Sequence, residues 1–355
     1  MGSSALYHLS RRGQRVLGLE AFQPGHRLGS YHGESRVIRL AYHEHPNYVP
    51  LLRRAYALWD DVQHESGEDL LRITGGLLIG RPDGELVSGA RASADQHGLD
   101  FELLEAQEVH LRFPALHLAE DEIALYEPRV GFLRPERCIE TFVRLAGAET
   151  HYGEAVRSWR AHAGGVEVST DAHQYEAEHV VFTCGARISS VLGACMPPVK
   201  AERAVLFWIE PADPEAFALG RMPVYLSEDF YGFPHVEWPG VKVARHHTGD
   251  FCDPDTVDRT VNAQDELRLR RAIENRIPSL NGRVLSSLIC LYENSPDGHF
   301  IIDRVVEHPN IIYAGGFSGH GFKFASVVGE ILADLVTRGK ATSDADFLRA
   351  DRFAA

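Results

Sequence analysis

The feature that most constrains the fold is a glycine-rich turn placed between a buried strand and a helix. The apolar run at 310–314 predicts the strand, and a helix is predicted from about Phe322 to Thr337. Four glycines in the seven residues between them allow the backbone to pass flat against a ligand. The helix then points its free N–H groups at that ligand. The turn therefore indicates a cofactor site, although a phosphate cradle or a packing device would use the same residue types. The residues expected to face the ligand are Gly316, Gly319, His320 and Gly321.

The first twenty residues resemble one half of a dinucleotide-binding βαβ unit. A helix capped by Ser3 or Ser4 leads to a short buried strand that closes on Glu20. In such units the third glycine permits close helix packing, and an acidic residue about twenty positions later binds the ribose hydroxyls. Gly2 and Glu20 hold these places, but the first strand and the first two glycines are absent. Either Met1 is an internal methionine of a longer protein, or the chain binds a nucleotide poorly.

The order of the remaining patterns predicts two interwoven domains. A second small-residue turn, around Gly185, follows an apolar strand and suits a backbone that approaches a nucleotide. No internal repeat and no low-complexity linker separates one region from another. The sequence therefore predicts a mixed α/β (α+β) fold, in which a Rossmann-like domain is woven together with an antiparallel-sheet domain. Helical patterns cover 48–63, 105–112, 133–145 and 265–277, and strand patterns cover 76–79, 155–159, 166–169 and 180–182.

Composition excludes several classes of function. The net charge of -14 argues against nucleic acid or an anionic membrane surface as the main partner. The apolar runs are too short to span a bilayer and no leader opens the chain, so a cytoplasmic location is expected. The five cysteines include no CxxC pair, so neither a disulfide framework nor a metal site is expected. Of the 36 basic residues only four are lysines, which makes each retained lysine worth inspection. These lysines are Lys200, Lys242, Lys323 and Lys340.

Several long motifs resemble the monomeric sarcosine oxidase and N-methyltryptophan oxidase family, which are FAD-dependent amine oxidases. They are CLYENSPDGHFIID at 290–303, GFSGHGFKF at 316–324, HGESRVIRLAY at 32–42, and YGFP at 231–234 with GVK at 240–242. The resemblance covers essentially the whole chain. It implies an FAD-binding domain made of residues 1–70, 131–198 and 285–355. A substrate-binding domain would then consist of residues 71–130 and 199–284.

The resemblance also implies roles for single residues. Cys290 matches the cysteine that is joined through its sulfur to the flavin, so FAD is expected to be covalent. Arg39 and Lys323 match the pair that clamps the substrate carboxylate, and two cations converging on one anion suit charge-assisted recognition. Lys242 matches a lysine that promotes the reaction of reduced flavin with oxygen. From the residues alone, Cys290 is predicted to be a buried inert thiol and Arg39 to be one half of a surface ion pair.

Further positions match residues that surround the reacting groups. Tyr231, His246 and Tyr292 correspond to pocket residues around the amine, and His32 and Arg36 to residues near the other face of the flavin. The two tyrosines could equally be core aromatics, and His246 could be structural. A departure from the family pattern is Arg187, where an aromatic residue is more usual.

The implied reaction is oxidation of an N-methyl amino acid, sarcosine or N-methyl-L-tryptophan, to the amino acid, formaldehyde and hydrogen peroxide. Segments 294–296 and 324–330 lean slightly toward the N-methyltryptophan branch. Small-molecule substrate and oxygen are then the only expected partners of a monomeric protein. Two other hypotheses are a flavin dehydrogenase that passes electrons to another acceptor, and an inactive truncated relative. Oxygen consumption and flavin content separate the three.

Overall fold

Two groups of parallel strands each join segments that lie far apart in the sequence. The first pairs β1 (Leu17–Glu20) with β8 (Glu149–Tyr152), and the second pairs β12 (Val180–Phe182) with β20 (His308–Gly315). The antiparallel strand β19 (Ile301–Val305) completes the second group. The computed structural model describes residues 1–353, and within them no strand pairs with the second edge of β1 or of β12.

Helix α1 (Gly2–Arg11) packs between α5 (Pro135–Ala146) and α8 (Ala325–Arg338). The prediction that Ser3 or Ser4 caps α1 is wrong, because the helix already begins at Gly2 and no side chain caps it. Ser4 instead lies inside the helix interface, where its hydroxyl donates to the backbone of α8. A serine on a buried helix face finds its acceptor in the neighbouring helix rather than in its own first turn.

Helix α2 (Tyr48–Ser66) packs against α8 and α5, and the three helices share one hydrophobic core. The apolar residues of one face of this helix are all buried, and its end is marked by Gly67 in the left-handed conformation. Helix α8 begins three residues later than predicted, because Phe322–Phe324 form a 3₁₀ turn first. The buried face of α2 comprises Leu51, Leu52, Ala55, Leu58 and Trp59.

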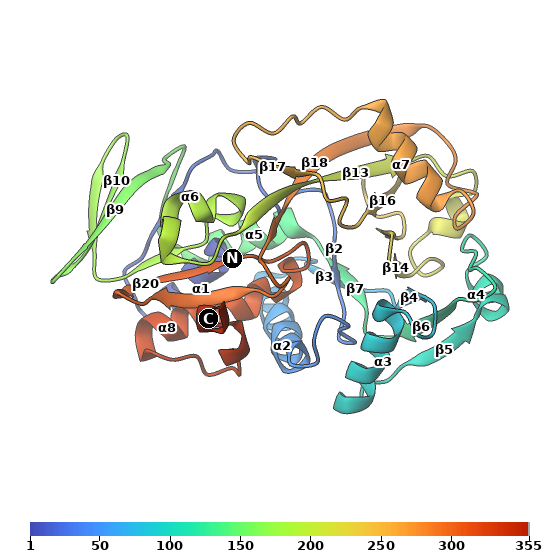
Figure 1. The fold of residues 1–355 in the computed structure, drawn as a ribbon, viewed down its shortest axis with the longest axis horizontal. Coiled ribbons are helices and arrows are strands. Elements are labelled where there is room, and N and C mark those ends of the chain that lie inside the picture. The colour runs from blue at the N-terminus through green and yellow to red at the C-terminus, as the bar shows by residue number, and fades with distance from the viewer. Residues whose placement is uncertain (354–355) are drawn as a thin grey trace.

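A nine-stranded sheet forms the other half of the molecule, with the strand order β17, β13, β16, β15, β14, β4, β6 and β5 and with β18 on the second side of β13. Its longest strands are the antiparallel pair of β13 (Lys200–Ile209) and β18 (Val284–Asn294), which run side by side at one edge of the sheet (Figure 1). The remaining strands are β4 (Gly76–Gly80), β5 (Glu102–Glu105), β6 (Ile123–Glu127), β14 (Val224–Ser227), β15 (Phe230–Gly232), β16 (Val241–Arg245) and β17 (Phe251–Cys252).

Smaller elements complete the fold. Strands β9 and β10 project at one end of the molecule (left in Figure 1). No helix within residues 1–353 has the length and apolar character that crossing a bilayer requires. The two small sheets contain β2 (Arg36–Ile38), β7 (Gly131–Leu133) and β3 (Leu71–Ile73), and β9 (Val156–His162), β10 (Gly165–Thr170) and β11 (Gln174–Ala177). The other helices are α3 (Glu85–His97), α4 (Ala106–Arg112), α6 (Ile188–Leu192) and α7 (Ala263–Ile273).

Candidate functional site

One cavity of about 2850 Å³ connects the parallel strands to the nine-stranded sheet. It brings together most of the site residues expected from the sequence, although their positions in the chain run from 2 to 323. His32, Lys242 and Gly316 lie outside the cavity wall. The predicted residues that line the cavity are Gly2, Glu20, Arg36, Arg39, Gly185, Tyr231, His246, Cys290, Tyr292, Gly319, His320, Gly321 and Lys323.

Close backbone packing shapes the end of the cavity next to α1. A β-carbon added to Gly2 would lie 2.7 Å from the hydroxyl oxygen of Thr183, so the helix start rests directly on the turn that follows β12. In that turn Gly185 has a φ of +57°, a conformation that favours glycine. The carboxylate of Glu20 accepts the backbone N–H of Phe22 at 3.0 Å and lies at the end of β1. A glycine, an acid and a second glycine turn therefore share this end of the cavity.

Cys290 lies on β18, with its sulfur buried against a cation. The Sγ atom is 3.4 Å from Nη2 of Arg36. That guanidinium is itself held by three backbone carbonyls, of Ser30, His32 and Ser35, at 2.6–3.0 Å. The cation is thus fixed beside the sulfur rather than free to swing away.

His32 and Lys242 support the site from behind the cavity wall. Burial, with Arg36 nearby, lowers the pKa of His32 to about 3, so its ring is neutral and donates to the carbonyl of Ile289 on β18. The ammonium of Lys242 donates to the carbonyls of Gly33 and Ser35 at 2.5 and 2.7 Å. Burial holds the pKa of Lys242 well below its usual range. Both residues therefore fix the loop at 32–36, and neither touches the cavity.

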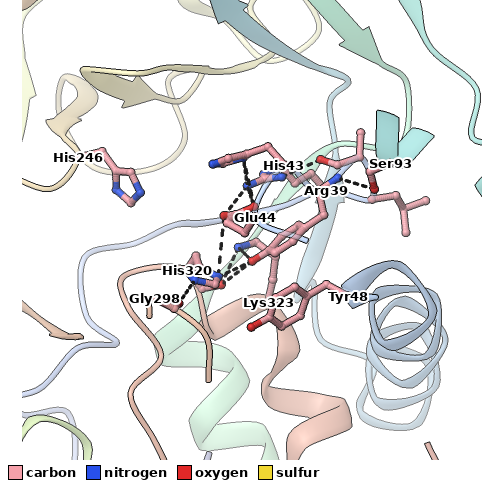
Figure 2. A network of polar contacts seen from close by, with 12 residues as sticks. Arg39, His43, Glu44, Tyr48, Ser93, His246, Gly298, His320 and Lys323 are labelled. Atoms are coloured by element: carbon pink, nitrogen blue, oxygen red, sulfur yellow. Dashed lines mark hydrogen bonds and ion pairs between the residues drawn. The ribbon is translucent and has the colours of Figure 1, made fainter. Parts of the chain in front are cut away.

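Arg39 is the centre of a buried polar network (Figure 2). Its Nη2 lies 2.8 Å from each carboxylate oxygen of Glu44, and its Nη1 donates to the carbonyl of Ala41 at 2.7 Å. Burial raises the pKa of Glu44, but Arg39 together with His43, His320 and Lys323 outweighs burial and holds this pKa well below its usual range. Arg39 is 2% exposed, so most of its charge is satisfied inside the protein.

Lys323 approaches the same network from the turn before α8. Its ammonium donates to the carbonyl of His320 at 2.7 Å and lies 5.2 Å from the ring centre of Tyr42, the ring that Arg39 covers from 4.3 Å. Burial, followed by the charge of Arg39, lowers the pKa of Lys323 to about 7. Two cations of the cavity wall therefore flank one buried tyrosine, and Lys323 is only partly protonated at neutral pH.

His320 is held in one orientation by its neighbours. Burial lowers its pKa to about 3, so the ring is neutral. Its Nε2 lies 3.0 Å from the carbonyl of Gly298, which can only accept, so Nε2 carries the proton and Nδ1 accepts from the hydroxyl of Tyr42 at 2.5 Å. This orientation links the glycine-rich turn to the Arg39 network.

His246, Tyr292 and Tyr231 form an aromatic wall at the sheet side of the cavity. Nδ1 of His246 lies 3.1 Å from the hydroxyl of Tyr292, and the ring of Tyr231 meets His246 edge-on at 5.9 Å. Burial, followed by the neighbouring His247, holds the pKa of His246 well below its usual range. A neutral imidazole between two phenols suits recognition of an uncharged amine.

Comparison with known proteins identifies the family of this fold. The family model described as FAD dependent oxidoreductase matches residues 1–335. The chain belongs to this family. It is 42% identical to a monomeric sarcosine oxidase of Streptomyces avermitilis over 96% of this chain and 91% of that protein. It is 34% identical to the N-methyl-L-tryptophan oxidase of Escherichia coli over 99% of this chain and 96% of that protein.

Solved structures of flavoenzymes share the fold of this oxidoreductase. An L-proline dehydrogenase from P. horikoshii superposes with a TM-score of 0.86 at 23% identity, over 99% of this chain and 94% of that one. A glycine oxidase from Geobacillus kaustophilus gives a TM-score of 0.82 at 19% identity, over 99% and 95%. At these identities the likeness concerns the fold alone.

The cavity of this FAD-dependent oxidoreductase fits its cofactor. Four buried polar atoms on cavity-lining residues have no protein partner within residues 1–353, namely the hydroxyl of Ser30, Nε of Arg39, Oε2 of Glu293 and Oδ1 of Asn294. Buried polar groups are nearly always satisfied, so these atoms indicate a polar ligand. A β-carbon added to Gly319 would lie 2.8 Å from the ring of Tyr292, which keeps the turn flat along the cavity.

Sequence reasoning missed Glu44 and Tyr42. Tyr42 falls inside a recognised motif, but its contact with both cations depends on the path of the loop. Glu44 lies five residues after Arg39 in an irregular segment, where no helical or strand periodicity predicts which side chains meet. The signal that could have drawn attention to it is an acidic residue shortly after a predicted carboxylate-binding arginine.

Proposed function

We propose that this protein is a flavin-dependent oxidase of N-methyl amino acids with FAD attached through Cys290. The observation that carries the proposal is the single cavity that has Cys290 beside Arg36 on one wall and the two cations Arg39 and Lys323 on another. Sarcosine is the first substrate to test, because 42% identity to a sarcosine oxidase exceeds the 34% to an N-methyl-L-tryptophan oxidase. We keep the division into an FAD domain (1–70, 131–198, 285–355) and a substrate domain (71–130, 199–284) as part of the proposal.

The chain's own side chains would bind and orient the substrate. Arg39 and Lys323 hold its carboxylate by charge-assisted hydrogen bonds, which fixes the N-methyl group relative to the cavity wall formed by Tyr292. His246 and Tyr231 would face the amine, and because His246 is neutral it can hydrogen-bond an uncharged amine. Bound FAD would supply the acceptor for one hydride equivalent from the methyl carbon, and oxygen would take up the two electrons afterwards.

The overall reaction balances as follows. The N-methyl amino acid, oxygen and water give the amino acid, formaldehyde and hydrogen peroxide. The C–H bond of the methyl group is broken, the resulting imine adds water, and the C–N bond then breaks to release formaldehyde. Because the carboxylate clamp is common to both candidate substrates, the choice between sarcosine and N-methyl-L-tryptophan depends on the space beyond the amine.

The decisive experiment combines two measurements on the purified protein. Acid denaturation should leave yellow flavin on the polypeptide, and addition of sarcosine or N-methyl-L-tryptophan should consume oxygen with one peroxide formed for each formaldehyde. Colourless protein would instead support an inactive relative. Size-exclusion chromatography tests the proposed monomer, and cell fractionation tests the proposed cytoplasmic location.

A dehydrogenase is the second candidate, and the position of Lys242 favours it. The side chain is 1% exposed and its ammonium is directed at backbone carbonyls rather than into the cavity. Substrate turnover with an artificial electron acceptor, but without oxygen uptake, would support the dehydrogenase over the oxidase.

A further inference from the structure

The backbone of the segment that carries Arg39 is hydrogen-bonded to the nine-stranded sheet. Glu127, the last residue of β6, is 1% exposed and accepts the backbone N–H groups of Leu40 and Ala41 at 3.0 and 2.9 Å. Two N–H groups on one buried carboxylate form charge-assisted hydrogen bonds, which are stronger than neutral ones. Glu127 itself does not line the cavity.

The next peptide unit of the segment connects this anchor to the guanidinium. The Ala41 carbonyl and the Tyr42 N–H belong to one planar peptide group. The carbonyl accepts from Nη1 of Arg39 at 2.7 Å, and the N–H donates to the hydroxyl of Ser93 on α3 at 3.3 Å. Glu127 thus fixes two successive peptide planes and Ser93 fixes the plane that follows them, and this last plane orients Arg39.

Helix α3 limits the segment by close packing as well. A β-carbon added to Gly89 would lie 3.0 Å from the carbonyl oxygen of His43 and 3.1 Å from its Cα. Gly89 and Ser93 are four residues apart, so they lie on the same face of the helix. On this face of α3, the Ser93 hydroxyl accepts a hydrogen bond from the segment, and Gly89 leaves room for the backbone of His43.

We infer that Glu127, together with Ser93 and Gly89, positions Arg39 for the substrate carboxylate. This inference rests on the proposed role of Arg39 in binding that carboxylate. Removing the Glu127 carboxylate leaves two buried N–H groups without acceptors, and the segment must move to satisfy them. Arg39 follows, because one of its hydrogen bonds ends on the same backbone. None of the three residues touches the substrate, so each acts through Arg39.

The test measures binding of acetate, a minimal carboxylate, to the flavin-loaded protein through the change in flavin absorbance. Glu127→Leu should raise the Kd of acetate at least about tenfold, as misplacement of a binding group does. Glu127→Gln keeps one acceptor oxygen and should give an intermediate Kd. Gly89→Ala should also weaken acetate binding, since its methyl group displaces the backbone of His43. In turnover, the KM for sarcosine should rise with the Kd of acetate while kcat stays within about threefold.

Two reference variants separate the possible failures. Asp334 is another fully buried carboxylate, which lies on α8 and accepts the backbone N–H of Thr342. Asp334→Asn should leave acetate binding unchanged. If Arg39→Ala does not weaken acetate binding, the proposed clamp is wrong. If Arg39→Ala weakens binding but Glu127→Gln, Ser93→Ala and Gly89→Ala do not, the positioning inference is overturned. Should Glu127→Leu fail to fold, the other three variants still decide the question.

Discussion

Nη2 of Arg39 lies 2.8 Å from both carboxylate oxygens of Glu44, so the arginine expected to receive the substrate already holds a carboxylate of its own chain (Figure 2). A substrate carboxylate must share or displace this partner. The binding free energy of the substrate is then reduced by the free energy of the Arg39–Glu44 pair, which the buried location makes larger than that of a surface pair.

Glu44→Gln should therefore tighten carboxylate binding. With the competing negative charge removed, we expect the Kd of acetate and the KM for sarcosine to fall about tenfold, equivalent to about 1.4 kcal/mol. Glu85→Gln, which changes an exposed glutamate on the same cavity wall, serves as the control. An unchanged or weaker affinity in Glu44→Gln would show that the carboxylate does not compete.

Substrate affinity should depend on the protonation of Lys323. Because its pKa is lowered to about 7 by burial and by Arg39, the ammonium is present below pH 7 and is lost above it. We expect the Kd of acetate to increase by up to about tenfold per pH unit above pH 7, the slope for loss of one proton. Lys323→Arg stays charged at these pH values and should remove this dependence between pH 7 and 9. A steep dependence that persists in Lys323→Arg would assign the titration to another group.

Cys290→Ser should release the flavin on denaturation. In the unaltered protein, we expect flavin absorbance to remain with the acid-precipitated polypeptide, and in the variant to pass into the supernatant. Cys138→Ser, a substitution of another buried cysteine on α5, should keep the flavin attached. Flavin that stays on Cys290→Ser protein would place the attachment elsewhere.

The oxidase proposal predicts that Lys242→Met slows reoxidation of the reduced flavin, whereas the dehydrogenase alternative predicts no change. A fixed positive charge that stabilises developing superoxide contributes roughly 10²-fold to the rate, whereas anaerobic reduction by sarcosine should change little. Rapid-mixing absorbance measurements resolve the two half-reactions, with the exposed Lys340→Met as control. Equal reoxidation rates in the two variants would support the dehydrogenase alternative.

His8 should make the protein sensitive to acid. Burial lowers its pKa from 6.5 to about 4, so the unfolded chain takes up a proton below pH 6.5 that the folded chain refuses until about pH 4. Stability is complete above pH 6.5 and falls by about 1.4 kcal/mol per pH unit in this window. In His8→Gln the slope of the unfolding free energy between pH 6 and 5, measured in urea, should be smaller by that amount. His64→Gln, at an exposed position, should leave the slope unchanged.

Much of the fold could be predicted because periodicity and glycine placement are local properties. The turn before α8, the buried face of α2 and the β1 strand ending at Glu20 all follow from neighbouring residues. The start of α1 was misplaced because the partner of Ser4 lies more than three hundred residues away, on α8. A buried serine and a capping serine look alike until that partner is known.

The candidate site could be predicted only as far as motifs extend. The motif residues Cys290, Arg39 and Lys323 line one cavity, as the resemblance implied. Glu44 and Glu127 were not predicted, because their contacts with the Arg39 segment depend on irregular backbone and on the approach of a distant strand. Lys242 lies behind the cavity wall and does not line the cavity. The direction of its side chain decides this, and a sequence motif does not specify that direction.

The pairing of β18 with β13 has a consequence for how this protein can diversify. Cys290 lies opposite Ala204 and Tyr292 opposite Glu202, so both side chains lie on one face of a single strand, two residues apart. A slip of one residue would turn both away from the cavity together. The spacing between the proposed attachment point and the aromatic wall therefore changes only with the register of the whole strand, so substitutions on β18 can alter either side chain without altering that spacing.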